Sequence, residues 1–185
     1  MRLVILGGSG SGKSTQAQKL CGHFDLPIIS IDEILSEVFE NYIDIYHHSQ
    51  PSIKKKTGMS NEVMIEFIRS RLTQADLKKG WVLEGYPLNV LQAEELDFLV
   101  DDLGQKLDWA IYLQVPQAVM VNRSLGSFLP DDQPEIVQRR VELFYDRTVP
   151  VLEYYDHHRR LLTINGDQSP GMVHQNIITL LSLAQ

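Results

Sequence analysis

Short apolar runs alternate with stretches of helical periodicity along nearly the whole chain. The apolar runs lie at 3–6, 27–29, 81–83, 109–115 and 161–164. Between them, helical spacing of apolar residues appears at 14–24, 60–77, 89–100, 135–157 and from Ser169 onward. Because the apolar runs are continuous rather than alternating, they predict strands that are buried on both faces. The pattern therefore predicts an α/β fold, with a five-stranded parallel sheet sandwiched by helices.

Two prolines and two irregular segments refine this picture. Pro116 follows the fourth run and is expected to begin a helix as its first residue, and Pro150 is expected to kink the long helical stretch. Residues 41–58 and 126–134 fit the alternation poorly, and we expect both to be mobile flaps.

Composition narrows the class of protein. A chain of 185 residues suits one domain, and a net charge of -7 argues against broad affinity for nucleic acid. No run of 18 apolar residues occurs, so no membrane span is expected. The lone Cys21 excludes an internal disulfide and a zinc site of several thiolates, and it is expected to be a small core residue. Since the first strand starts at Arg2, where a signal peptide would lie, we expect a cytoplasmic protein.

The residues after the first apolar run carry the clearest chemistry. Gly7 to Ser14 read GGSGSGKS, which matches the phosphate-binding P-loop pattern G-x-x-x-x-G-K-[ST]. The glycines let the backbone turn its N–H groups toward a phosphate, and the helix behind them adds its positive end. Lys13 would supply a charge to the β- and γ-phosphates, and the Ser14 hydroxyl would bind Mg²⁺. The predicted ATP-binding residues of this loop are Gly8, Ser9, Gly10, Ser11, Gly12, Lys13, Ser14 and Thr15.

Further motifs follow in an order that resembles the adenylate kinase family, or more broadly the nucleoside monophosphate kinases. The motifs are TQA at 15–17, ISIDEIL at 29–35, WVLEGYP at 81–87, QA at 92–93, Arg123 with Gly126, DD at 131–132, RR at 139–140 and YY at 154–155. The resemblance covers nearly the whole chain.

This resemblance implies a fold, a reaction and cofactors. It implies a P-loop NTPase domain with a core at 1–29, 60–122 and 136–185, a mobile acceptor-binding flap at 30–59 and a short lid at 123–135. The implied reaction transfers the γ-phosphoryl group of ATP, bound with Mg²⁺, to a nucleoside monophosphate, with AMP as the default acceptor. The partners are thus ATP and a small phosphorylated acceptor, and the family implies a monomer.

The family's residue roles carry over where the motifs match. Lys13, Arg123 and Arg140 would be catalytic, with Arg123 also lying over the adenine of ATP. Glu84 would hold Mg²⁺ through water, beside Ser14. The predicted acceptor-binding residues are Ser30, Met59, Glu84, Gly85 and Gln92. From the residues alone, Arg123 and Gln92 also suit an exposed helix surface, and Arg140 suits an ion pair with a glutamate of its own helix.

The chain departs from the family pattern at four expected arginines. Ser36, Leu88, Ser127 and Leu129 stand where the family has cations that face the transferred or acceptor phosphates. Each charge-assisted hydrogen bond is worth about 1.5–3 kcal/mol, so the loss is large unless other cations replace them. Candidate replacements are Lys54, Lys55, Lys56, Arg69, Arg71 and Arg147.

Three functions remain open from the sequence. The first is phosphoryl transfer to AMP. The second is a kinase of the same build that uses a less anionic acceptor, and the third is an ATP-binding regulator with weak catalysis. The retained donor side and the altered acceptor side are compatible with all three.

Overall fold

A computed structural model describes residues 1–34, 61–126 and 134–184. Within these residues, five strands form one parallel sheet in the order β2-β3-β1-β4-β5. The strands are β1 (Arg2–Leu6), β2 (Ile28–Ser30), β3 (Trp81–Glu84), β4 (Trp109–Gln114) and β5 (Leu161–Asn165). The predicted five-stranded parallel sheet is confirmed. Most of the predicted flap and of the predicted lid lies outside the described residues.

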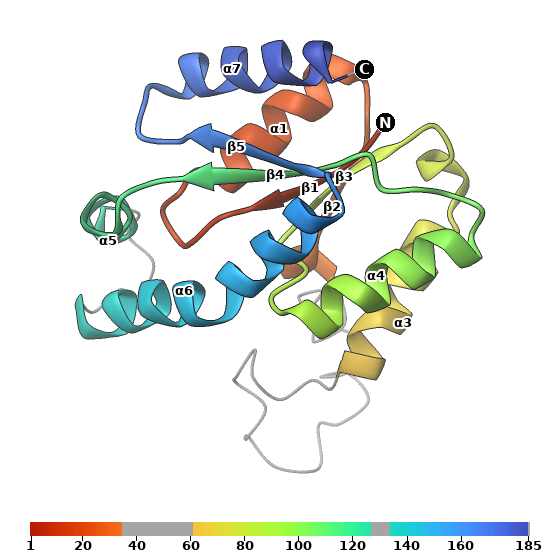
Figure 1. Ribbon diagram of the computed structural model, residues 1–185, viewed down its shortest axis with the longest axis horizontal. Coiled ribbons are helices and arrows are strands. Elements are labelled where there is room, and N and C mark those ends of the chain that lie inside the picture. The colour runs from red at the N-terminus through yellow and green to blue at the C-terminus, as the bar shows by residue number, and fades with distance from the viewer. Residues whose placement is uncertain (35–60, 127–133, 185) are drawn as a thin grey trace.

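Helices cover both faces of the sheet. They are α1 (Lys13–Phe24), α3 (Asn61–Leu72), α4 (Val90–Asp102), α5 (Gln117–Leu125), α6 (Pro134–His157) and α7 (Pro170–Leu183), with a short 3₁₀ helix η1 (Ala75–Leu77). Figure 1 shows α1 and α7 on one face, and α3, α4 and α6 on the other. Successive residues of β1 point to opposite faces of the sheet. Leu3 and Ile5 pack with α1 and α7, whereas Val4 and Leu6 pack in the core on the other face. This explains why the strands read as continuous apolar runs.

The predicted bounds of two helices differ from the structure, and one predicted kink is untested. The helix predicted over 60–77 ends at Leu72, because the backbone is extended at Gln74. Leu77 still completes the apolar pattern, since it reaches the core from η1 and is fully buried. Pro116 precedes α5 as its N-cap rather than beginning it. Pro150 lies inside α6 without ending it, and the predicted kink stays a prediction.

Cys21 lies on α1 and packs against the core formed with α7. Burial raises the pKa of its thiol to about 11, so the thiol stays protonated at neutral pH. This environment agrees with the expected structural role. Within the part of the chain that the structure describes, no helix combines the length and apolarity needed to cross a membrane.

The topology brings the candidate residues to one edge. β1 lies at the centre of the sheet between β3 and β4, and the register pairs Ile5 with Glu84. Because all strands run parallel, the segments that follow β1, β2 and β3 leave the sheet at the same edge. The loop after β1, Ser30 and Glu84 are thereby brought together, although they are far apart in sequence.

Candidate active site

The loop between β1 and α1 forms a cradle of backbone groups. Gly10 and Gly12 have φ angles of 79° and 92°, which residues other than glycine rarely adopt. A Cβ atom at Gly10 would also lie 2.3 Å from the carbonyl oxygen of Met120 on α5, so the loop must pass close to this helix. The Ser11 N–H donates to the Gly8 carbonyl at 3.1 Å and closes the turn. The first N–H groups of α1 and its positive end follow directly, as a phosphate requires.

Lys13 folds back over this cradle. Its ammonium group donates to the Gly8 carbonyl oxygen at 2.9 Å, which holds the charge beside the loop. A cavity of about 440 Å³ opens in front of it. The predicted residues that line this cavity are Ser9, Gly10, Gly12, Lys13, Ser14, Thr15, Ser30, Glu84, Gly85 and Arg123. Donor-side and acceptor-side candidates from four segments of the chain therefore share one cavity.

Ser14 and Glu84 meet across this cavity. The Ser14 hydroxyl donates to Glu84 Oε1 in a very short hydrogen bond, so the longer glutamate side chain does reach the loop. A hydroxyl and a carboxylate beside a phosphate site are the hard oxygen donors that Mg²⁺ takes, together with water and substrate phosphates. The described residues contain no cluster of three or more His, Cys, Asp or Glu side chains suited to a metal, and such an Mg²⁺ site needs none.

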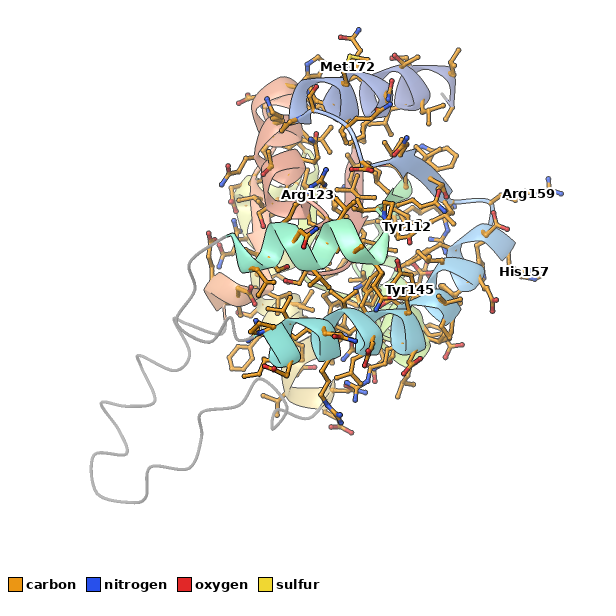
Figure 2. The ribbon with its side chains drawn as sticks, turned by 90° about the vertical axis from the view of Figure 1, so that its left-hand side faces the viewer. Tyr112, Arg123, Tyr145, His157, Arg159 and Met172 are labelled. Atoms are coloured by element: carbon orange, nitrogen blue, oxygen red, sulfur yellow. The ribbon has the colours of Figure 1, made fainter. Side chains whose placement is uncertain are left out.

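Arg123 joins this cavity to a second one. Figure 2 shows its side chain leaving α5 on the side of α7, and it donates to the Gly166 carbonyl at 3.1 Å and to Asp167 at 3.2 Å. The second cavity has a volume of about 230 Å³ and is lined by Arg123 together with Gly10, Ser11, Gly12, Thr15, Gln16, Gly166, Gln168, Pro170 and Val173. A planar guanidinium at the mouth of a pocket beside the phosphate cradle suits stacking on a nucleotide base.

Two candidate residues, Gln92 and Arg140, do not line the cavity that contains Lys13. Gln92 is 8% exposed, and its amide accepts from the Leu88 N–H at 2.7 Å and donates to Asn61 at 2.9 Å. It therefore ties α4 to α3 here, and its role toward an acceptor base stays a prediction. Arg140 is exposed on α6 and does not line the cavity that contains Lys13, so its catalytic role also stays a prediction.

Two of the candidate replacement cations form ion pairs away from the cavity, and three lie outside the described residues. Arg71 pairs with Asp76 at 2.8 Å, and Arg69 lies 3.5 Å from Asp102, so both guanidinium groups are paired with carboxylates. Neither lines the cavity. Ser36, Ser127, Leu129, the lysines 54–56 and the predicted acceptor residue Met59 lie outside the described residues.

Some residues of the cavity were not predicted. Asp32 and Ser124 line it, and the Ser124 hydroxyl donates to Ser9 Oγ at 3.1 Å. Gly166 and Asp167, which hold Arg123, directly follow β5. Since ligand groups gather beyond the carboxyl ends of parallel strands, the end of the fifth apolar run was a signal for this pair.

Comparisons with known proteins agree with the motif order. The family model described as adenylate kinase matches residues 5–160. The chain is 67% identical over 181 residues to "Adenylate kinase 2" of Nostoc sp. (strain PCC 7120), covering 98% of each protein. It is 47% identical over 181 residues to "Adenylate kinase 2" of Synechocystis sp. (strain PCC 6803), covering 98% of this chain and 100% of the relative. It is 36% identical over 168 residues to "Adenylate kinase 1" of the same Nostoc strain, covering 91% of each. The chain belongs to the adenylate kinase family.

Proposed function

We propose that the protein is an adenylate kinase that transfers the γ-phosphoryl group of ATP to AMP. An oxygen of the AMP phosphate bonds to the γ-phosphorus, the bond from that phosphorus to the β–γ bridging oxygen breaks, and two ADP molecules result. The observation that carries the proposal is the single cavity in which Lys13, Ser14, Glu84 and Arg123 converge on the P-loop. Family membership and relatives named adenylate kinase that cover the chain end to end point to the same reaction.

In this proposal, the donor half of the site would hold ATP. Backbone N–H groups of residues 8–15 and the Lys13 ammonium would neutralise the β- and γ-phosphates as charge shifts during transfer. Arg123 would stack on the adenine from its place between the two cavities. Mg²⁺ would be held by the Ser14 hydroxyl and, through water, by Glu84, and it would supply charge neutralisation of the phosphates.

The acceptor half rests on fewer described groups. Ser30 and Gly85 line the cavity at the ends of β2 and β3, and we assign them to acceptor binding with Glu84. We also propose Met59 and Gln92 as acceptor contacts and Arg140 as a residue that acts on the transferred phosphoryl group. The proposed domain division has a flap at 30–59, a lid at 123–135, and a core made of 1–29, 60–122 and 136–185. A cytoplasmic location and a monomeric state likewise stay predictions.

Calorimetry and a substrate panel test the proposal together. Wild-type protein is titrated with Mg-ATP and then assayed for ADP release with each nucleoside monophosphate. We expect binding and turnover with AMP. Lys13→Ala should reduce turnover by about 10²–10³-fold, because it removes a charge that stabilises the transferring group. Lys19→Ala is the matched control, since Lys19 is exposed on the same helix α1 and does not line the cavity.

The other outcomes distinguish the alternatives. Turnover with a different monophosphate and none with AMP would favour a kinase for another acceptor. Tight Mg-ATP binding with no turnover of any acceptor would favour a regulatory protein. If Mg-ATP gave no heat and Lys13→Ala behaved like Lys19→Ala, the P-loop assignment itself would be wrong.

A further inference from the structure

The helix α5 lies directly against the phosphate-binding loop. A Cβ atom at Gly8 would lie 2.8 Å from Met120 Sδ, so the lack of a side chain there makes room for the helix. A Cβ atom at Gly10 would lie 2.3 Å from the Met120 carbonyl oxygen and 2.8 Å from Ser124 Oγ. Met120 and Ser124 are 1% and 4% exposed. The position of the helix and the shape of the loop therefore depend on each other, because close-packed groups transmit small displacements.

A side-chain hydrogen bond crosses this contact. The Ser124 hydroxyl donates to Ser9 Oγ at 3.1 Å, and both residues line the cavity of about 440 Å³. Arg123, the preceding residue of the same turn, donates to Gly166 and Asp167 beyond β5. Two consecutive residues of α5 therefore tie its last turn to two segments, the loop after β1 and the segment after β5.

The last turn of α5 depends on this hydrogen bond more than the loop does. The turn of the loop is closed by the Ser11 N–H and by the Lys13 ammonium group, which both donate to the Gly8 carbonyl. Neither of these hydrogen bonds involves α5. The helix ends at Leu125, and the last carbonyl groups of a helix lack intrahelical partners, so helix ends fray. Loss of the bond from Ser124 should therefore loosen the turn that carries Arg123 before it changes the cradle.

We infer that Ser124 is a positioning residue for the donor nucleotide, and that its hydrogen bond to Ser9 holds Arg123 in place between the two cavities. This inference rests on the proposed function, which places the adenine of ATP against Arg123. It adds to the donor site a residue that lies outside the P-loop motif and acts through its neighbour in the helix. The ligand that it concerns is a nucleoside triphosphate, and the part of that ligand that it affects is the base.

The physical expectation is a moderate effect that is confined to ligands with a base. The net contribution of a hydrogen bond between neutral groups corresponds to about a two- to tenfold change in a binding constant. Inorganic tripolyphosphate with Mg²⁺ carries the phosphates of ATP without the base, so it should occupy the cradle without using Arg123. Loss of the bond between Ser124 and Ser9 should therefore weaken the binding of Mg-ATP and leave the binding of Mg-tripolyphosphate unchanged.

A double-mutant cycle across the hydrogen bond provides the test. Ser124→Ala and Ser9→Ala each remove one hydroxyl, and Ser9→Ala keeps the backbone N–H of the loop. We expect each single variant to raise Kd for Mg-ATP, measured by calorimetry, about three- to tenfold. The double variant should lose no more than either single variant, because the same bond is lost in all three. Asn122→Ala is the matched control and should equal wild type, since Asn122 is exposed on the same helix and lines neither cavity.

Two further titrations examine whether Ser124 acts through Arg123. In an Arg123→Ala background, Ser124→Ala should change Kd for Mg-ATP by less than about twofold, because the side chain that it positions is gone. The inference is overturned if the effect persists undiminished in that background, or if Ser124→Ala weakens Mg-tripolyphosphate as much as Mg-ATP. It is also overturned if Ser9→Ala binds Mg-ATP like Asn122→Ala.

These binding measurements separate the inference from the proposed function. If wild type binds Mg-ATP without phosphorylating AMP, the proposed function fails, while a non-additive cycle still supports the inference. If wild type turns AMP over but the effects of Ser124→Ala and Ser9→Ala add, the inference alone is overturned. Thermal melting verifies that each variant is folded. Should the buried Ser124→Ala melt below the assay temperature, Ser9→Ala at its half-buried position tests the same bond, with Mg-ATP and Mg-tripolyphosphate as the two ligands.

Discussion

Leu88 offers a direct way to test the acceptor side of this enzyme. The adenylate kinase resemblance places an arginine at this position, and the structure shows that the leucine is 52% exposed just after Gly85 of the cavity lining. Its N–H donates to Gln92 at 2.7 Å, so the backbone at this point is fixed by α4. An arginine introduced here would have room for its side chain, and its backbone would be held in place by the hydrogen bond to Gln92. We expect Leu88→Arg to increase kcat/KM for AMP.

The size of the gain follows from the exposure of the site. A hydrogen bond to a charged group contributes about 1.5–3 kcal/mol when it is well formed. Solvent screening and the entropy of ordering a long side chain at a half-exposed position reduce this contribution. A net value of about 1.4 kcal/mol corresponds to about a tenfold increase in kcat/KM for AMP. Because the arginine would act on the acceptor, KM for Mg-ATP should change little.

Leu91 supplies the matched control for this prediction. It is 54% exposed on the first turn of α4, outside the loop that follows Gly85, so Leu91→Arg adds the same charge at a similar exposure but from the helix. Initial rates of ADP release at varied AMP and saturating Mg-ATP distinguish the two variants. If Leu88→Arg gained no more than Leu91→Arg, the acceptor phosphate would be bound elsewhere, and the reasoning from the missing arginines would be refuted.

Two further predictions concern the metal and the stability of the fold. Glu84→Gln should raise the Mg²⁺ concentration needed for half-maximal turnover severalfold, since it removes the charge opposite the Ser14 hydroxyl; an unchanged Mg²⁺ titration would contradict the assigned role. Asp97→Asn should lower the free energy of unfolding by about 2–4 kcal/mol, because Asp97, 18% exposed, accepts from Arg160 at 3.0 Å and from the Tyr154 hydroxyl at 2.7 Å. Urea unfolding measures this loss, and Asp101→Asn on the exposed side of the same helix should cost under about 0.5 kcal/mol.

Particular residues show where sequence reasoning stopped short. The apolar pattern predicts one helix over 60–77, yet an extended Gln74 separates α3 from the 3₁₀ helix that carries Leu77. The family motif predicts an acceptor contact for Gln92, which stays a prediction, but it does not contain the hydrogen bonds of this side chain with Leu88 and Asn61. The residues that hold Arg123 come from the end of β5, more than 40 positions away. Hydrogen bonds of this kind depend on where the chain returns in space, which a local pattern does not contain.

The sequence by itself determined the five buried strands, their parallel arrangement, the phosphate-binding loop and the family. Burial on both faces requires continuous apolar runs, and a phosphate cradle requires glycines and one lysine within a few residues. Both features can therefore be recognised from short stretches of the sequence. Only the tertiary structure decided that Glu84 reaches Ser14, that Arg123 lies between two cavities, and that Asp32 lines the cavity that contains Lys13. These relations arise because strand order and register bring distant loops to one edge of the sheet.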